Sequence, residues 1–337
     1  GFSYKGGGGA LSPSAFAVRF RCASLRVKAG HAWPIDFPVH RQMRGAPRKA
    51  ARGDRMIRYV AKRLLMLIPI IVGITFIVFF ILSLTPGDPA RMILGANATP
   101  AQVEAMREQM GLNDPVLIRY VKYMGGVIRG DFGTSWSTRE PVFQMVFARF
   151  PYTFQLALLS MLVTVAASIP LGIYSAVKQN TAADSTVMVL SMVLAATPKF
   201  WLGILMMLVF SVWLRWLPTS GLVSCKSYIM PTVAMAAAST AINTRIVRAS
   251  VLDVIKQDYI RTARAKGVKE QTIFRRHALK NAMLPVVTVM GMSFASALGG
   301  SVLIENVFSI PGIGLLMIER IRQKDIPSVL ACVIFIA

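Results

Sequence analysis

The sequence predicts an all-α integral membrane protein with six transmembrane helices and an extracytoplasmic helical insertion after the first. Hydrophobic residues make up 54% of the 337 residues and charged residues only 16%, whereas about a quarter of an ordinary globular domain is charged. A helix needs about 20 apolar residues to cross the hydrocarbon core of a bilayer. Three runs of at least this length contain no charge: 64–84, 150–177 and 282–304.

Residues 1–55 differ from the rest of the chain. They carry 11 Lys/Arg against 2 Asp/Glu, include four consecutive glycines at 6–9, and show no helical or strand periodicity. We expect a disordered leader, or upstream sequence translated ahead of a natural start at Met56. A basic RNA-binding arm is the alternative. A cleaved signal peptide fits poorly, because the first apolar run is long enough to span and no small-residue cleavage site follows it.

The first predicted span is followed by a polar segment, and together they form the region 56–148. The polar part is nearly neutral, and Thr99-Pro100 with Glu104 predicts a capped helix start there, with Gly111 as the stop. We interpret it as a small extracytoplasmic subdomain.

The remaining spans belong to a core domain, 149–337. Pro198-Lys199 interrupts the third span, and 305–326 is expected to be an external loop. The final apolar stretch has 12 residues, which predicts a truncated last helix. The six spans are expected at 58–84, 150–177, 186–214, 228–249, 283–304 and 326–337.

The distribution of basic residues predicts the orientation. Arg58, Lys62 and Arg63 precede the first apolar run, and 250–282 carries 8 Lys/Arg against 3 acids. Since cytoplasmic loops are enriched in Lys and Arg, both segments are predicted to be cytoplasmic, with the N-terminus inside.

The sequence lacks the residue patterns that nucleotide binding, intramembrane catalysis, metal binding and nucleic-acid binding would require. There is no GxxxxGK[ST] phosphate loop, none of the three histidines lies in a predicted span, and no pair of acids does either. The three cysteines form no CxxC pair, and no zinc-finger spacing or aromatic-basic module suggests nucleic acid as a partner. We therefore expect no catalytic residue, cofactor or metal site. The alternative is a membrane-embedded enzyme with a Ser-Lys dyad at Lys199.

The segment 253–285 carries the most information. Its residues 253–266 predict a short helix with an apolar side and a basic rim, and Gly267 can take the left-handed conformation that ends such a helix. A second helix is expected at 270–280, with Pro285 opening the next span. A basic loop retained by its charge alone is the alternative interpretation.

The stretch RTARAKG at 261–267 resembles the conserved cytoplasmic loop of ABC importer permeases, in which Glu-Ala-Ala is followed by three residues and Gly. Ala263 and Gly267 match, whereas Arg261 and Thr262 depart from the Glu and Ala. With Arg and Thr at these two positions, the loop resembles that of the dipeptide, oligopeptide and nickel permeases, which form one branch of the family. Further motifs typical of this branch are TPGDP (85–89), GLNDP (111–115), GDFGTS (130–135), LPTSG (217–221) and ENVFSIPGIG (305–314).

The resemblance implies a type I ABC importer permease fold in which this loop forms a coupling helix. It implies half of a translocation pathway for di- or oligopeptides in a bacterial inner membrane, with nickel or a metal chelate as the alternative substrate. The implied partners are a second homologous permease, two ATP-binding subunits that hydrolyse the ATP, and an extracytoplasmic substrate-binding protein. A simple channel or secondary transporter is the rival class. The implied docking residues are Tyr259, Arg261, Ala263 and Gly267, and the residues that set the loop's angle are His277, Asn281 and Pro285.

Polar residues inside spans are candidates for the pathway, because they are costly in lipid. They are Asn243, Ser293, Ser296 and Ser301. Hydrogen bonds between helices are the alternative role. Glu305 and Asn306 are expected at the external mouth, in reach of the substrate-delivering protein.

Overall fold

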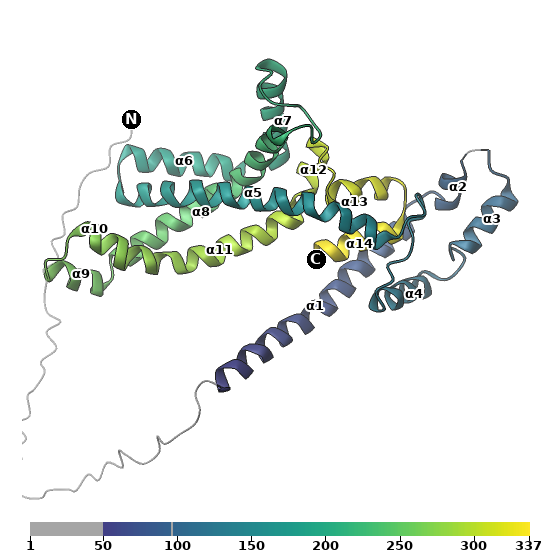
Figure 1. The fold of residues 1–337 in the computed structure, drawn as a ribbon, viewed down its shortest axis with the longest axis horizontal. Helices are drawn as coiled ribbons and strands as arrows, with labels where there is room; N and C mark the ends of the chain where they lie inside the picture. The colour runs from purple at the N-terminus through teal and green to yellow at the C-terminus, as the bar shows by residue number, and fades with distance from the viewer. Residues whose placement is uncertain (1–49, 96) are drawn as a thin grey trace, which may run out of the picture. The chain divides into compact units, whose positions relative to one another are not determined.

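The computed structural model describes residues 50–337 except 96, and it divides the chain into two units, Gly1–Arg58 and Tyr59–Ala337. The described residues form helices joined by turns and by two longer loops, 129–141 and 214–224, and they contain no strand (Figure 1). The expectation of a disordered leader falls mostly outside the described residues. Helix α1, Ala50–Leu84, begins inside that expected leader, because 50–55 contains Ala and Arg, which favour helix.

Three helical stretches are long and apolar enough to cross a membrane: Arg58–Leu84 in α1, Val142–Val177 (α5), and Glu270–Gly300, which contains α11 (Leu279–Gly300). They confirm the expected first, second and fifth spans. Length and composition support up to five spans if each of two bent helix pairs is one span. Helix α8, Ile229–Ile255, is long but less apolar, and α14, Ile326–Ile336, has 11 residues.

The first bent pair is the expected third span. Helix α6, Ala182–Ala196, and α7, Lys199–Met206, meet at an angle of 100°, and a π-helix, Met207–Trp213, extends α7 (Figure 1). The bend has a local cause, because Thr197 precedes Pro198 and takes an extended conformation (ψ 124°). The predicted interruption is therefore a sharp change of direction.

The second bent pair corrects the expected external loop at 305–326. This segment forms α12, Val302–Phe308, and α13, Ile313–Arg322, which meet at 82°. Ser309 ends α12 in the left-handed conformation, with φ of 51°. The apolar residues of this stretch pack as two short helices because a hydrogen-bonded clamp, described below, holds the start of α13.

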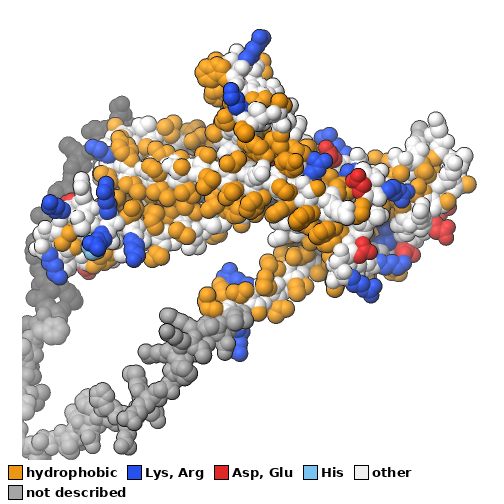
Figure 2. All heavy atoms as spheres, in the orientation of Figure 1, with side chains coloured by type: hydrophobic (Ala, Val, Ile, Leu, Met, Phe, Trp, Pro, Cys, Tyr) orange, Lys and Arg blue, Asp and Glu red, His pale blue; other side chains and the backbone are white. Residues whose placement is uncertain are grey.

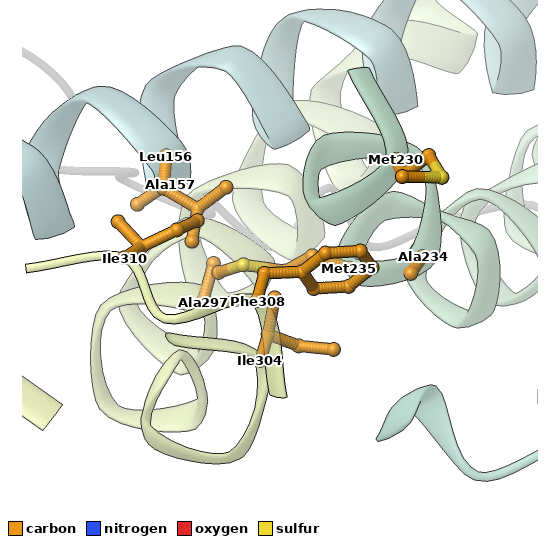
Figure 3. Packing of buried hydrophobic residues seen from close by; sticks show 9 residues of the cluster. All are labelled: Leu156, Ala157, Met230, Ala234, Met235, Ala297, Ile304, Phe308 and Ile310. Carbon is orange, nitrogen blue, oxygen red and sulfur yellow. The ribbon is translucent and has the colours of Figure 1, made fainter. Parts of the chain in front are cut away.

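Close packing of α5 against α8 organises the core. A Cβ atom on Gly172 of α5 would lie 2.6 Å from Cβ of Val247 on α8, so only glycine allows this approach. Figure 3 shows the adjoining cluster, in which Leu156 of α5, Met235 of α8 and Phe308 of α12 pack together. Figure 2 shows hydrophobic side chains along α5, α6 and α11, with Lys and Arg gathered at the end that carries α9 and α10.

The predicted subdomain after α1 contains α2 (Pro89–Leu94), α3 (Pro100–Gln109) and α4 (Val116–Ile128). The capped start of α3 is confirmed, but Gln102 rather than Glu104 completes the capping box with Thr99, since it is the third residue after the cap. Gly111 takes a positive φ of 65° just beyond the end of α3.

A buried carboxylate ties this region to the C-terminal part of the chain. Asp325, fully buried, accepts hydrogen bonds from Ser135 Oγ (2.5 Å), Ser137 Oγ (3.2 Å), Ser328 Oγ (2.8 Å) and the Trp136 N–H (3.1 Å). The GDFGTS motif thus ends at a serine that binds the turn between α13 and α14.

Candidate functional site

The segment that resembles a coupling loop folds into two short helical pieces. Helix α9 covers Asp258–Ala265, and α10, Glu270–Thr272, continues into a π-helix, Ile273–Ala278. The first piece begins at 258 rather than at the expected 253, because α8 continues to Ile255 before the chain breaks at Lys256-Gln257.

One apolar side anchors α9. Ile260 is fully buried against Ile273 and Ala278, and Ala263 is partly buried against the same cluster. Gly267 takes a φ of 75°, and its N–H donates to the Arg264 carbonyl at 2.9 Å. The predicted left-handed end of this helix is therefore confirmed.

The other side of α9 is open. Tyr259 is 42% exposed, and the Arg261 side chain is 77% exposed. Nη1 of Arg261 lies 3.9 Å from Oδ1 of Asp258. Arg264 binds Glu270 at 2.6 Å across the turn, and this hydrogen bond raises the pKa of Arg264. A short helix fixed by one buried isoleucine and a cross-turn ion pair thus presents an exposed arginine and tyrosine.

The residues expected to set the angle of the loop behave differently from one another. Asn281 Nδ2 donates to the Tyr259 hydroxyl at 2.9 Å, which links α9 to α11, whereas His277 is exposed. Pro285 does not open the span as expected. It lies inside α11, because the helix is continuous from Glu270, so Pro285 is an interior proline and not the first residue of the helix.

Two of the predicted pathway residues meet between α8 and α11. Asn243 is fully buried, and its Nδ2 donates to the Ser239 carbonyl (2.8 Å) and to Ser293 Oγ (3.1 Å). Its Oδ1 has no hydrogen-bond partner among the described residues. A small cavity beside this pair is lined by Ser160, Thr164, Ser239 and Ser293 together with five apolar residues, Met161, Val165, Met290, Phe294 and Ala297.

The other two pathway candidates do not join this pair. Ser296 is exposed on α11. Ser301 is buried, and its hydroxyl donates to the Leu298 carbonyl at 3.1 Å, which is a local bond within one helical turn.

Glu305 corrects the expectation of a residue at the external mouth. It is fully buried, and its carboxylate accepts hydrogen bonds from Thr153 Oγ1 (2.8 Å) and from the N–H groups of Gly314 (2.7 Å) and Leu315 (3.1 Å). A carboxylate at a helix start is favourable because the first N–H groups of α13 have no partner inside the helix. Asn306, by contrast, is half-buried.

The glycines of the ENVFSIPGIG motif make room for this clamp. A Cβ on Gly312 would lie 2.4 Å from a Glu305 carboxylate oxygen, and one on Gly314 would lie 2.5 Å from Cα of Val302. The motif is therefore explained by a buried acid that caps α13 at close range.

Sequence reasoning missed an ion pair that joins three helices. Asp184 of α6 accepts hydrogen bonds from Arg248 Nε (2.7 Å) and Nη2 (2.6 Å) of α8, and also from Ser175 Oγ of α5. The two partners are 64 residues apart, and the available signal was a pair of arginines, Arg245 and Arg248, inside the expected fourth span. The part of the chain that the structure describes has no group of three His, Cys, Asp or Glu side chains suited to a metal ion.

Comparison with known proteins gives consistent matches over most of the chain. Residues 168–337 match the binding-protein-dependent transport system inner membrane component family, and 56–157 match the N-terminal region of such membrane components. The glutathione transport system permease protein GsiC of Escherichia coli (strain K12) is 42% identical over 276 residues, which are 82% of this chain and 90% of GsiC. The proteins of the same name from Salmonella typhi and Salmonella paratyphi A give the same identity and coverage.

Proposed function

The chain belongs to the family of binding-protein-dependent transport system inner membrane components, and we propose that it forms half of a translocation pathway for di- and oligopeptides. It is an ABC importer permease of the dipeptide, oligopeptide and nickel branch, and a multi-pass inner membrane protein. The relatives are named for glutathione transport, and because glutathione is a small peptide, this supports a peptide substrate.

The observation that carries the proposal is the geometry of α9. A short helix with an exposed arginine and tyrosine, held from behind by Ile260, suits a groove on another protein. We assign this surface, formed by Tyr259, Arg261 and Gly267 with the partly exposed Ala263 at its edge, to docking on an ATP-binding subunit. Closure of two such subunits would then move the helices behind α9 as rigid bodies.

Asn243 and Ser293 are the best candidates for the pathway. Buried polar groups normally have hydrogen-bond partners, and the Oδ1 of Asn243, which has none among the described residues, lies near a cavity of about 10 Å³ with four hydroxyl-bearing residues in its wall, which supports contact with water. Ser296 could join them from the exposed side of α11.

The proposed orientation places the N-terminus and α9 in the cytoplasm, which agrees with the basic residues around them. The proposed assembly contains this chain, a homologous second permease, two ATP-binding subunits and an extracytoplasmic binding protein near Asn306. ATP hydrolysis belongs to the partner subunits.

The test is reconstitution of the chain in nanodiscs with the subunits encoded beside it. We expect the ATPase rate to rise with binding protein plus glutathione or a dipeptide, and not with nickel. Copurification without an ATPase would contradict the importer role, and stimulation by nickel alone would contradict the peptide substrate.

Two variants test the docking surface. Arg261→Glu reverses an exposed charge, and we expect it to lower the stimulated rate by about tenfold or more, because like charges at an interface are costly. Gly267→Trp should act in the same direction. Lys178→Glu, at an exposed lysine in the turn before α6, is the matched control. Normal coupling in Arg261→Glu would show that α9 does not dock through this side.

A further inference from the structure

Two cavities in the region after α1 share one arginine. Cavities of about 550 and 600 Å³ both include Arg119 of α4 in their walls. The larger one is also lined by Phe79 of α1, by Tyr123 and Trp136, and by the acidic residues Glu108 and Asp114. Arg119 therefore lies where these two hollows meet, beside the carboxyl end of a membrane-spanning helix.

Arg119 makes no direct ion pair within the described part of the chain, although the charge of Asp114, in the wall of the same cavity, acts to raise its pKa. Its neighbours are paired: Arg107 binds Asp88 at 2.9 Å, and Lys122 binds Asp114 at 2.6 Å. Arg119 has neither an ion pair nor a side-chain hydrogen bond among the described residues, and its guanidinium lies 5.6 Å from the centre of the Phe79 ring. Burial lowers the pKa of Arg119, but a guanidinium remains protonated at neutral pH. The half-buried guanidinium of Arg119 thus has donors that no described side chain uses, and these donors can bind an anion.

The outer sides of α4 and of the last turns of α1 are apolar, although the walls of the two cavities also contain charged and polar residues. Helix α4 exposes Leu117 (62%) and Val121 (61%), and the last turns of α1 expose Ile77 and Ile81 (58% each). Because α1 is long and apolar enough to span the bilayer, its exposed side chains face acyl chains unless protein covers them. Phe79 lies five residues before the end of α1, about 8 Å along the helix axis, so the cavity is at the level where the hydrocarbon core ends.

Aromatic side chains mark the same level. Tyr123 and Trp136 line the cavity, and these two residue types concentrate where acyl chains meet headgroups. An amphipathic helix with one exposed apolar side, such as α4, is typical of a helix that lies in this interface.

We propose that Arg119 binds the phosphate of a phospholipid whose acyl chains lie along the exposed sides of α4 and the carboxyl-terminal turns of α1. The planar guanidinium can donate two parallel hydrogen bonds to a phosphate, which suits this headgroup better than a point charge would. The lipid would fix α4 against α1.

The test uses the purified full chain in detergent, with lipid retention measured by native mass spectrometry. The probes are phosphatidylglycerol, diacylglycerol, which lacks the phosphate, and glycerol 3-phosphate, which lacks the acyl chains. We expect the wild-type protein to retain phosphatidylglycerol about tenfold more strongly than diacylglycerol, and glycerol 3-phosphate not to displace it.

Arg119→Gln should remove this preference, and Arg119→Lys should keep part of it. The matched control is Arg129→Gln, at an exposed arginine that follows the last residue of the same helix. Equal retention of phosphatidylglycerol and diacylglycerol by the wild-type protein would overturn the proposal without relying on any variant. Displacement by glycerol 3-phosphate or by a free peptide would also overturn it, since the site would then bind a soluble anion.

Discussion

The carboxylate of Glu305 can be removed in graded steps. Glu305→Ala deletes three hydrogen bonds and leaves two buried donors, Thr153 Oγ1 and the Gly314 N–H, and one partly buried donor, the Leu315 N–H, without this acceptor. Each buried donor left unsatisfied costs about 1–3 kcal/mol, so we expect a loss of about 4 kcal/mol or more. Glu305→Gln keeps an acceptor oxygen but loses the charge. Since charge-assisted hydrogen bonds are roughly twice as strong as neutral ones, we expect a loss of about 1–2 kcal/mol.

The assay is unfolding of the purified chain in mixed micelles by a denaturing detergent, followed by circular dichroism. Glu319→Ala, at an exposed glutamate on the same helix α13, is the control and should stay within about 0.5 kcal/mol of wild type. The clamp interpretation would be refuted if Glu305→Ala and Glu319→Ala had the same free energy of unfolding. It would also be refuted if Glu305→Gln and Glu305→Ala were equally destabilised.

Three further predictions concern the packing of the core. Gly172→Ala should destabilise the chain by about 1–3 kcal/mol in the same unfolding assay, because its Cβ would overlap Val247, while Gly291→Ala, with nothing within 4 Å, should not. Arg248→Lys should lower the thermal unfolding temperature, because lysine cannot make the paired contact with Asp184, and a variant as stable as wild type would argue against this pair. Asp325→Ala should release the segment around Ser135, so protease cleavage at 130–141 should become faster while cleavage at 178–181 stays unchanged.

Sequence patterns predicted the structural features that depend on local composition, namely the long apolar helices and one helix end. Runs without charge indicated α1, α5 and α11, and Gly267 indicated a left-handed helix end, because both signals lie within one short stretch of chain. The position of Pro285 was misjudged, since a proline is common both at the start of a helix and at a kink inside a membrane helix.

The buried ionic contacts could not be predicted in this way. Glu305 meets Thr153 across 152 residues, and Asp184 meets Arg248 across 64. In the sequence, an acid next to an apolar run is as typical of a membrane boundary as of a buried hydrogen-bonded site. Only the packing of α5 against α8 and α12 shows that Glu305 is buried and not exposed at the external mouth.

The continuous helix from Glu270 to Gly300 has the properties of a lever. Its 31 residues give an arm of about 45 Å, so a tilt of about 5° at one end displaces the other by about 4 Å. If α9 docks as proposed, it would push on the Glu270 end of this arm through Ile260, and the Gly300 end leads into α12, whose Glu305 binds the start of α13. Pro285 and the π-helix before α11 are the points where this helix would flex, so their stiffness sets how much of a displacement at the Glu270 end reaches α13.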